Sequence, residues 1–345
     1  MNSVKKTLIT SRILELRLKL TAIFPGLLMC FVVGMAAKFI SEHYGGPTIL
    51  YAVLMGMAFN YMSLEGRCVA GIMFSAKAVL RFGIALLGAR ITIEQILGLG
   101  MTPIAIVLAG VPATIFFAMA CGKWLKLGTA QSALSGASVG ICGASAALAV
   151  ATVLPQNKDS EKNLIFTIIA VTALSTVAMI VYPLVADMLG FDETESGIFL
   201  GATIHDVAQV VGAGYMVSDN VGDVATFSKL LRVAMLVPVV VIISIIVTQR
   251  QSGDKKIGMV GLPLPGFLVA FVAVVICNSF GFLPGVISEF MIQMSRWCLI
   301  IAMVGLGMKA SFKELAQMGW RPMFLMVTNT LFLASLVGVS LFIAR

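Results

Sequence analysis

Long apolar stretches follow one another along nearly the whole chain, and no other feature constrains its fold as strongly. Hydrophobic residues make up 59% of the 345 residues and charged residues only 12%, about half the share of a typical soluble domain. So few charges cannot cover a soluble surface, whereas a bilayer accepts apolar helices of roughly 20 residues. The sequence therefore predicts an all-α membrane protein with about 10 or 11 transmembrane segments.

Most of these segments are ordinary spanning candidates, but the segments 130–154 and 196–216 are unusual. Both are rich in Gly, Ala, Ser and Thr and poor in Leu and Phe. No linker is long enough to separate soluble domains, so we expect a basic N-terminus over 1–19 and a single polytopic membrane domain over 20–345. The ordinary candidates cover residues 20–41, 47–62, 69–88, 95–120, 163–186, 225–248, 262–280, 284–306 and 318–343.

Basic residues in the N-terminus and in short loops predict a cytoplasmic N-terminus, because positive loops mark that face of a membrane. If 130–154 and 196–216 both cross the membrane, Lys158 and Lys162 face outward. If both are broken or re-entrant, these lysines face inward and the acidic loop Asp187–Glu195 faces outward, which fits the rule better. The basic residues are Lys5, Lys6, Arg12, Arg17, Lys19, Lys123, Lys126, Arg250, Lys255, Lys256, Lys309, Lys313 and Arg321.

A faint internal repeat relates residues 76–103 to residues 295–322 at a constant offset. In the topology above the two copies run in opposite directions, and inverted repeats of this kind are typical of secondary transporters. Helix–loop–helix turns also resemble one another for simple capping reasons, so this alternative stays open. The matched pairs are Lys77 with Arg296, Gly88 with Gly307, Arg90 with Lys309, Thr92 with Ser311, Gly100 with Gly319 and Pro103 with Pro322.

The first unusual segment, "SALSGASVGICGASAALAVATVLP", favours a helix broken near its middle. Its three central glycines each cost roughly 1 kcal/mol in a helix interior, although small residues also serve close helix packing. A second half starting near Gly143 would expose backbone N–H groups that attract anions, with Ser138 and Ser145 as hydroxyl donors. Gly140 lies at the expected break, and Cys142 is expected to pack there.

The second unusual segment, "GATIHDVAQVVGAG", places a polar cluster among apolar residues. Thr203 and Asp206 have the spacing of a capping box, which predicts a helix beginning at Ile204. His205 and Gln209 would then share one face of that helix. Ionisable groups inside a membrane are costly and point to function, and a histidine can change charge near neutral pH. Local capping by Asp206 and a structural hydrogen bond at His205 are the simpler alternatives.

Several cations lie inside predicted spans, while few carboxylates do. Lys77 and Arg81 are one turn apart near the middle of one span, and Lys229 and Arg232 are three residues apart at the start of another. The latter two are also placed to snorkel to the interface. Inner cations with few inner carboxylates predict an anionic substrate.

Other classes of function lack sequence support. The net charge of +8 comes from loops and the N-terminus, which indicates membrane orientation and not nucleic-acid binding. The six cysteines form no CxxC pair, and neither a zinc-protease, a serine-hydrolase nor a nucleotide-binding motif occurs. We therefore expect no catalytic residues, no metal and no cofactor, although an intramembrane enzyme remains the rival from another class.

The stretches "SVGICGASAALA", "GATIHDVAQVVGAG", "AKAVLRFGIALLGARIT" and "SKLLRVAMLVP" resemble the YeiH-type family of bacterial membrane proteins, which carries the label of sulfate exporter. The resemblance covers nearly the whole chain. It implies a multi-pass protein of the bacterial inner membrane with a fold like that of cation/proton antiporters. Lys77, Cys142, His205 and Gln209 lie in its motifs. This chain has "IHDVAQ" where relatives have "VHEVAQ", and the change keeps the carboxylate.

Together these features predict a secondary transporter of a small anion, with sulfate as the example that the resemblance suggests. The two broken segments would meet near the midplane and hold the anion. Sodium/proton-type cation antiport through Asp206 is the main alternative, and a channel is a third. H⁺ or Na⁺ could couple transport, and the sequence leaves the oligomeric state open, with a homodimer among the options.

Overall fold

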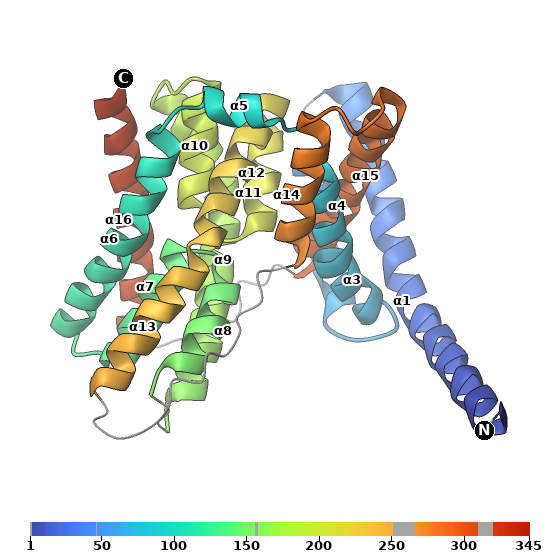
Figure 1. Cartoon of the computed structure of the whole chain (residues 1–345), viewed down its shortest axis with the longest axis horizontal. Helices are drawn as coiled ribbons and strands as arrows, with labels where there is room; N and C mark the ends of the chain where they lie inside the picture. The colour runs from blue at the N-terminus through green and yellow to red at the C-terminus, as the bar shows by residue number, and fades with distance from the viewer. Residues whose placement is uncertain (1, 46, 156–157, 251–265, 310–319) are drawn as a thin grey trace. The chain divides into compact units, whose positions relative to one another are not determined.

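The computed structural model describes residues 2–45, 47–155, 158–250, 266–309 and 320–345, which are helical with no strand among them (Figure 1). Seven helical stretches are long and apolar enough to cross a membrane, which confirms an all-α membrane protein. They are Leu20–Tyr44, Val69–Leu87, Pro103–Trp124, Ser160–Met188, Asp219–Val247, Gly285–Lys309 and Trp320–Ala344.

One predicted span is shorter than the sequence suggested, because the segment 47–62 forms only α2 (Thr48–Ala58) and a short 3₁₀ turn. The described part of 262–280 forms α14 (Gly266–Ser279). A further predicted span, 95–120, is divided: α5 (Ile93–Gly98) ends before Gly100, whose φ of +69° suits glycine, and α6 covers Thr102–Trp124. Apolar composition alone does not reveal these interruptions.

The chain divides into two compact units, where the sequence predicted one membrane domain. Unit 1 comprises Met1–Ala89 and Gly281–Ala310, and unit 2 comprises Arg90–Phe280 and Ser311–Arg345. Residues 251–265 and 310–319, which hold Lys255, Lys256 and Lys313, lie outside the described residues.

In unit 1, the helical segment of the first copy of the predicted repeat packs against the helix of the second copy. α3 (Val69–Phe74) and α4 (Leu80–Leu87) are joined by a π-helical turn, and α15 (Gly285–Lys309) lies beside them. Gly83 lies opposite Cys298 and Gly305 lies opposite Ala76, so the helical segment α3–α4 and helix α15 run antiparallel. α1 (Asn2–Tyr44) and α2 complete the unit, and α1 continues without a break through the predicted N-terminal region.

An inverted repeat requires the corresponding helices of its two copies to run antiparallel, as these do. Much of the second copy, including Ser311 and Gly319, lies outside the described residues. The repeat therefore stays a prediction. Rotation about an axis in the membrane plane should superpose residues 76–103 on 295–322.

Unit 2 contains the two unusual segments, and both are broken as the glycine pattern predicted. The first forms α7 (Thr129–Gly140) and α8 (Ala144–Val153), and the second forms α10 (Glu193–Thr203) and α11 (Val207–Val217). They are arranged around α6, α9 (Ser160–Met188), α12 (Asp219–Ala234) and α16 (Trp320–Ala344), with α13 (Leu236–Arg250) and α14 alongside.

Each broken segment doubles back as a hairpin. Gln131 of α7 and Leu154 after α8 line one small pocket together with Asn163 of α9, so the two ends of the first segment meet. In the second segment, Gly197 and Gly214 both lie against the first two turns of α12. The re-entrant arrangement, which the sequence left open, is therefore the observed one in unit 2.

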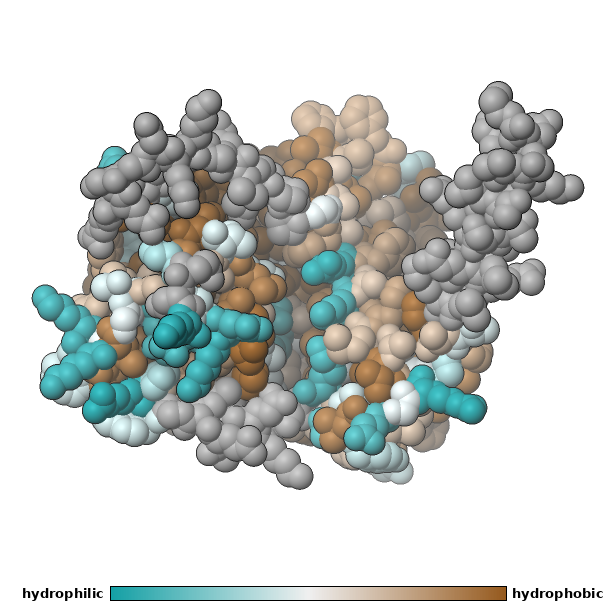
Figure 2. All heavy atoms as spheres, turned by 90° about the horizontal axis from the view of Figure 1, so that it is seen from below, coloured by the Kyte–Doolittle hydropathy of each residue, from teal (hydrophilic) through white to brown (hydrophobic). Residues whose placement is uncertain are grey.

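The hairpins enter unit 2 from opposite ends. The first lies beside the start of α9 at Asn163, whereas Phe199 of the second contacts Tyr182, about five turns further along α9, with ring centroids 5.6 Å apart. The loops and helix ends at the first end carry Lys123, Lys126, Lys158 and Lys162. Figure 2 views the chain from this end and shows hydrophilic side chains gathered on it. The acidic loop Asp187–Glu195 lies at the other end of α9.

Glycine makes the close approach of α10 to α12. A Cβ added to Gly201 would overlap the carbonyl oxygen of Ala225 and lie 2.6 Å from the Cβ of Ser228. We expect Gly201→Ala to push the two helices apart and to destabilise the protein by about 1–3 kcal/mol, measured by thermal unfolding. Gly98→Ala in α5, where a Cβ has nothing within 4 Å, is the control and should leave stability unchanged or slightly higher. Equal melting of both variants would contradict this close packing.

Candidate substrate site at two broken helices

The tips of the two hairpins meet in the interior of unit 2, and we call this region the crossover: residues 139–143 and 201–206. α7 ends at Gly140, and Gly143 turns the chain into α8 with a φ of +64°, a conformation that favours glycine. α10 ends at Thr203, and Ile204 and Asp206 are extended before α11 begins. A Cβ on Gly143 would lie 3.6 Å from the carbonyl oxygen of His205, so the two breaks are in close contact.

Two buried cations of α12 bind the carbonyl ends of both hairpins. Lys229 is fully buried, and its Nζ donates to the carbonyl oxygens of Ile141 at 2.8 Å and Ile204 at 2.9 Å. Arg232 is 1% exposed and makes four hydrogen bonds of 2.6 to 3.3 Å. Its acceptors are the carbonyl oxygens of Val139, Gly140, Gly201 and Ile204.

These contacts satisfy carbonyl groups that a helix end leaves without partners. The negative ends of two helix dipoles, those of α7 and α10, also meet at this point, and a cation stabilises such an end. The interpretation of Lys229 and Arg232 as snorkelling side chains was therefore wrong. α12 begins at Asp219, six residues before the predicted start, which places both cations deep in the unit.

The N-termini of α8 and α11, which are the positive helix ends at the crossover, differ in how they are capped. Asp206 caps α11 by accepting from the N–H of Ala208 at 3.2 Å, and Ser175 of α9 accepts from the N–H groups of His205 and Asp206. Gly143, the N-cap residue of α8, has no side chain with which to cap that helix. Asp206 is partly exposed, whereas residues 201–205 are buried.

Three predicted hydroxyl donors are placed differently from the expectation. Thr203 does not cap α11: it is the last residue of α10, and its hydroxyl donates to the carbonyl oxygen of Phe199 at 2.6 Å. Ser138 likewise donates to Leu134 of its own helix. Ser145 is exposed on the first turn of α8.

The side chains of His205 and Gln209 are buried, but they do not share a helix face because His205 precedes α11. The Nε2 atom of His205 lies 3.0 Å from the hydroxyl of Thr330 in α16, and Gln209 donates to the hydroxyl of Thr176 in α9 at 2.9 Å. Sequence reasoning missed these partners and Asn329. A lone Asn–Thr pair within the apolar segment 318–343 was the signal that could have found them.

The remaining predicted residues take several positions. Cys142 is buried at the crossover as a free thiol. Lys77 and Arg81 belong to unit 1, where both are exposed on the candidate span Val69–Leu87, with Lys77 in its π-helical turn. No group of three His, Cys, Asp or Glu side chains suited to a metal occurs in the parts of the chain that the structure describes.

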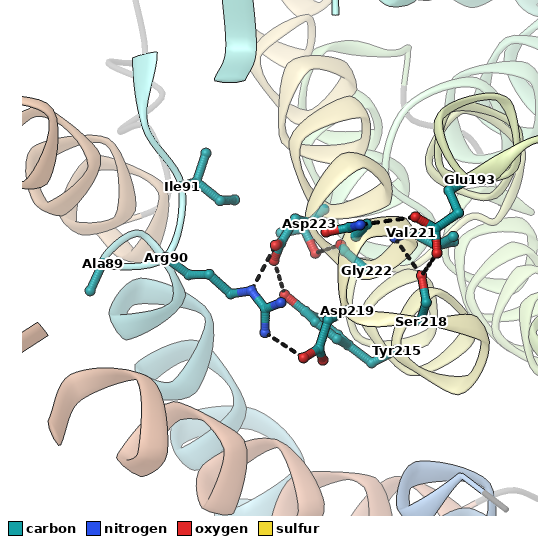
Figure 3. Close-up of polar contacts among 12 residues, drawn as sticks. Ala89, Arg90, Ile91, Glu193, Tyr215, Ser218, Asp219, Val221, Gly222 and Asp223 are labelled. Atoms are coloured by element: carbon teal, nitrogen blue, oxygen red, sulfur yellow. Dashed lines mark hydrogen bonds and ion pairs between the residues drawn. The ribbon is translucent and has the colours of Figure 1, made fainter. Parts of the chain in front are cut away.

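A pocket of about 260 Å³ opens at the acidic end of unit 2, but its carboxylates already have partners (Figure 3). Arg90 binds Asp223 at 2.7 Å and Asp219 at 3.1 Å, and the Tyr215 hydroxyl donates to Asp223. Hydrogen bonds from Asn220 and Ser218 hold the pKa of Glu193 below its ordinary value. We therefore place the candidate site at the crossover.

Comparisons with known proteins show that this chain is similar to a family of membrane proteins. Residues 25–326 match the family model described as conserved hypothetical protein 698. A UPF0324 membrane protein of Chlorobaculum tepidum, CT0845, is 53% identical over 91% of this chain and 88% of its own length. A UPF0324 membrane protein of Rhizobium meliloti, RB0971, is 47% identical over 97% and 96%. The UPF0324 membrane protein TauZ of Paracoccus denitrificans is 45% identical over 93% and 95%.

Proposed function

We propose that this chain, which belongs to the conserved hypothetical protein 698 family of membrane proteins, is a secondary transporter of a small anion. Its membrane would be the bacterial cytoplasmic membrane. The lysine-rich end of unit 2 would face the cytoplasm, because positive loops favour that side. Two hairpins meeting inside one unit resemble the broken helices that form substrate sites in many secondary transporters.

The charge of the crossover is the observation that carries the anion proposal. Two positive and two negative helix ends meet there, and their partial charges cancel in sum. Lys229 and Arg232 contribute two formal positive charges, and within the described residues neither forms an ion pair with a carboxylate. Asp206 contributes one negative charge. With both cations protonated and Asp206 ionised, one positive charge remains, and a bound anion would neutralise it.

His205 would link this site to protons. Its neighbour Ile204 already binds both Lys229 and Arg232, so a third positive charge on the imidazole is unfavourable while the site is empty. An anion would remove that obstacle, and proton and anion would then bind together. Asp206 is the carboxylate that a coupling ion would reach, since it is partly exposed beside the crossover.

The decisive experiment is counterflow in proteoliposomes with a panel of labelled anions, with sodium and pH gradients varied independently. We expect exchange of one class of anion. Sodium- or proton-driven cation flux, with no anion exchanged, would overturn the proposal and favour cation antiport through Asp206. Loss of ion coupling alone in a stable Asp206→Asn variant would place the coupling ion at that carboxylate.

We expect His205→Gln to flatten the pH dependence of anion affinity while keeping the fold, because glutamine retains a hydrogen bond to Thr330 but cannot take up a proton. In the natural protein, affinity should rise as the pH falls, since a protonated imidazole favours an anion. Binding against pH measures this, with melting temperature as the control. A variant with normal affinity and unchanged pH dependence would reduce His205 to a packing residue.

A further inference from the structure

Four side chains of unit 2 bury polar atoms that make no hydrogen bond to any described residue, and all four lie on elements that form or border the crossover. Leaving such atoms without partners in the interior is costly, and native folds do so rarely. Several of them on elements around one site therefore indicate a place where a ligand can supply the partners. They are Ser135 of α7, Gln209 of α11, Ser228 of α12 and Asn329 of α16.

The orientation of the Gln209 amide is fixed by its neighbours. Thr176 donates its hydroxyl proton to the carbonyl oxygen of Thr172, so its oxygen can only accept from Gln209. The same Gln209 nitrogen lies 3.5 Å from the Thr172 carbonyl oxygen, which is an acceptor too. The nitrogen of Gln209 must therefore face α9, and its Oε1 is left as an acceptor without a donor.

Asn329 leaves both amide atoms without partners, so its case does not depend on which way the amide is turned. It is fully buried, and the next residue, Thr330, contacts His205. One turn earlier, Leu325 lies beside Gly122, which also contacts Ser132 of α7. Asn329 therefore lies on α16 between Leu325, which is close to the start of α7, and Thr330, which contacts His205.

The unused groups specify the hydrogen bonding that the ligand must offer. The two amide oxygens of Gln209 and Asn329 can only accept, and the Asn329 nitrogen can only donate. A fully deprotonated oxyanion such as sulfate brings acceptors alone and would leave both amide oxygens without donors. We propose that the transported anion carries an O–H or N–H group of its own, received by Gln209 and Asn329, while its charged group neutralises the crossover.

This inference rests on the proposed anion transport and narrows its substrate class. It is tested with pairs of anions of equal charge and shape that differ only in a donor: 2-hydroxyethanesulfonate against propane-1-sulfonate, and glycolate against propionate. Competition in counterflow and ligand-induced shifts in melting temperature give both affinities. We expect the hydroxyl member of at least one pair to bind on the order of tenfold more tightly or better, because its loss leaves buried acceptors without partners.

Two variants locate the preference. Gln209→Met and Asn329→Leu should bring the two members of the pair to nearly equal affinity, mainly by weakening the hydroxyl member. Thr328→Val, one residue from Asn329 and bonded within its own helix, should keep the full preference. Asn329→Leu should melt at or above the natural protein, because it removes an amide without partners. A marked loss of stability would show that this amide has partners in the fold and would overturn its place in the site.

The two proposals fail in distinguishable ways. If the natural protein exchanges anions but binds both members of each pair equally, or prefers sulfate to every donor-bearing anion, the donor inference is wrong and anion transport stands. If Gln209→Met and Asn329→Leu keep the preference, the donor is received elsewhere and these two assignments fall. If no anion of the panel is exchanged or raises the melting temperature, the proposed function itself fails.

Discussion

Arg232→Met is expected to destabilise the protein by about 3–5 kcal/mol, the largest loss that we expect from any single side chain. Methionine nearly matches the length of the arginine stem but donates nothing, so four buried carbonyl oxygens lose a partner at once. Each lost partner costs up to about 1–3 kcal/mol, less what the hairpin tips regain by relaxing. Thermal unfolding followed with a thiol-reactive dye measures this, because the buried free thiols of Cys30, Cys142 and Cys298 become reactive when the protein unfolds.

Two further variants set the scale. Lys229→Met removes two hydrogen bonds and should cost less than Arg232→Met. Arg345→Met removes an exposed ion pair with Glu195 and should change stability by less than about 1 kcal/mol. The expected order of loss is therefore Arg232, then Lys229, then Arg345. If Arg232→Met melts like Arg345→Met, the crossover does not depend on the cations of α12.

The positions of the two breaks could be predicted because they have a local cause. Three glycines within one apolar segment weaken a helix at that point, whatever surrounds it, and the break falls at 141–143. The second break was predicted within a few residues for a partly wrong reason. The spacing of Thr203 and Asp206 suggested a capping box, but Asp206 caps α11 alone and Thr203 ends the helix before it.

The residues that hold the breaks together could not be predicted in the same way. Lys229 and Arg232 contact carbonyl oxygens nearly 90 residues earlier in the chain, and no local pattern encodes such a contact. A boundary error made matters worse. The predicted span began six residues after the true start of α12, which corresponds to about 9 Å of helix. That distance is the difference between a lysine at the membrane interface and a buried one.

The second large effect is expected at Lys77 and Arg81 of unit 1. Lys77 lies near the middle of the candidate span Val69–Leu87, and Arg81 lies one turn further along the same span. Both side chains are exposed, and neither makes a hydrogen bond or ion pair with a described residue. A charge at that depth facing hydrocarbon is costly, so this face of the span is expected to border water. If the chain transports anions as proposed, we expect this face to line the path of the substrate.

We therefore expect Lys77→Met and Arg81→Met to lower anion transport tenfold or more while leaving the melting temperature nearly unchanged, since neither side chain has a partner among the described residues to lose. Lys77→Arg should restore most of the transport because it keeps the charge. Arg67→Met is the matched control: it removes an exposed charge just outside the same span and should transport normally. Normal transport in stable Lys77→Met and Arg81→Met variants would show that this face does not border the anion path and that its cations serve another surface.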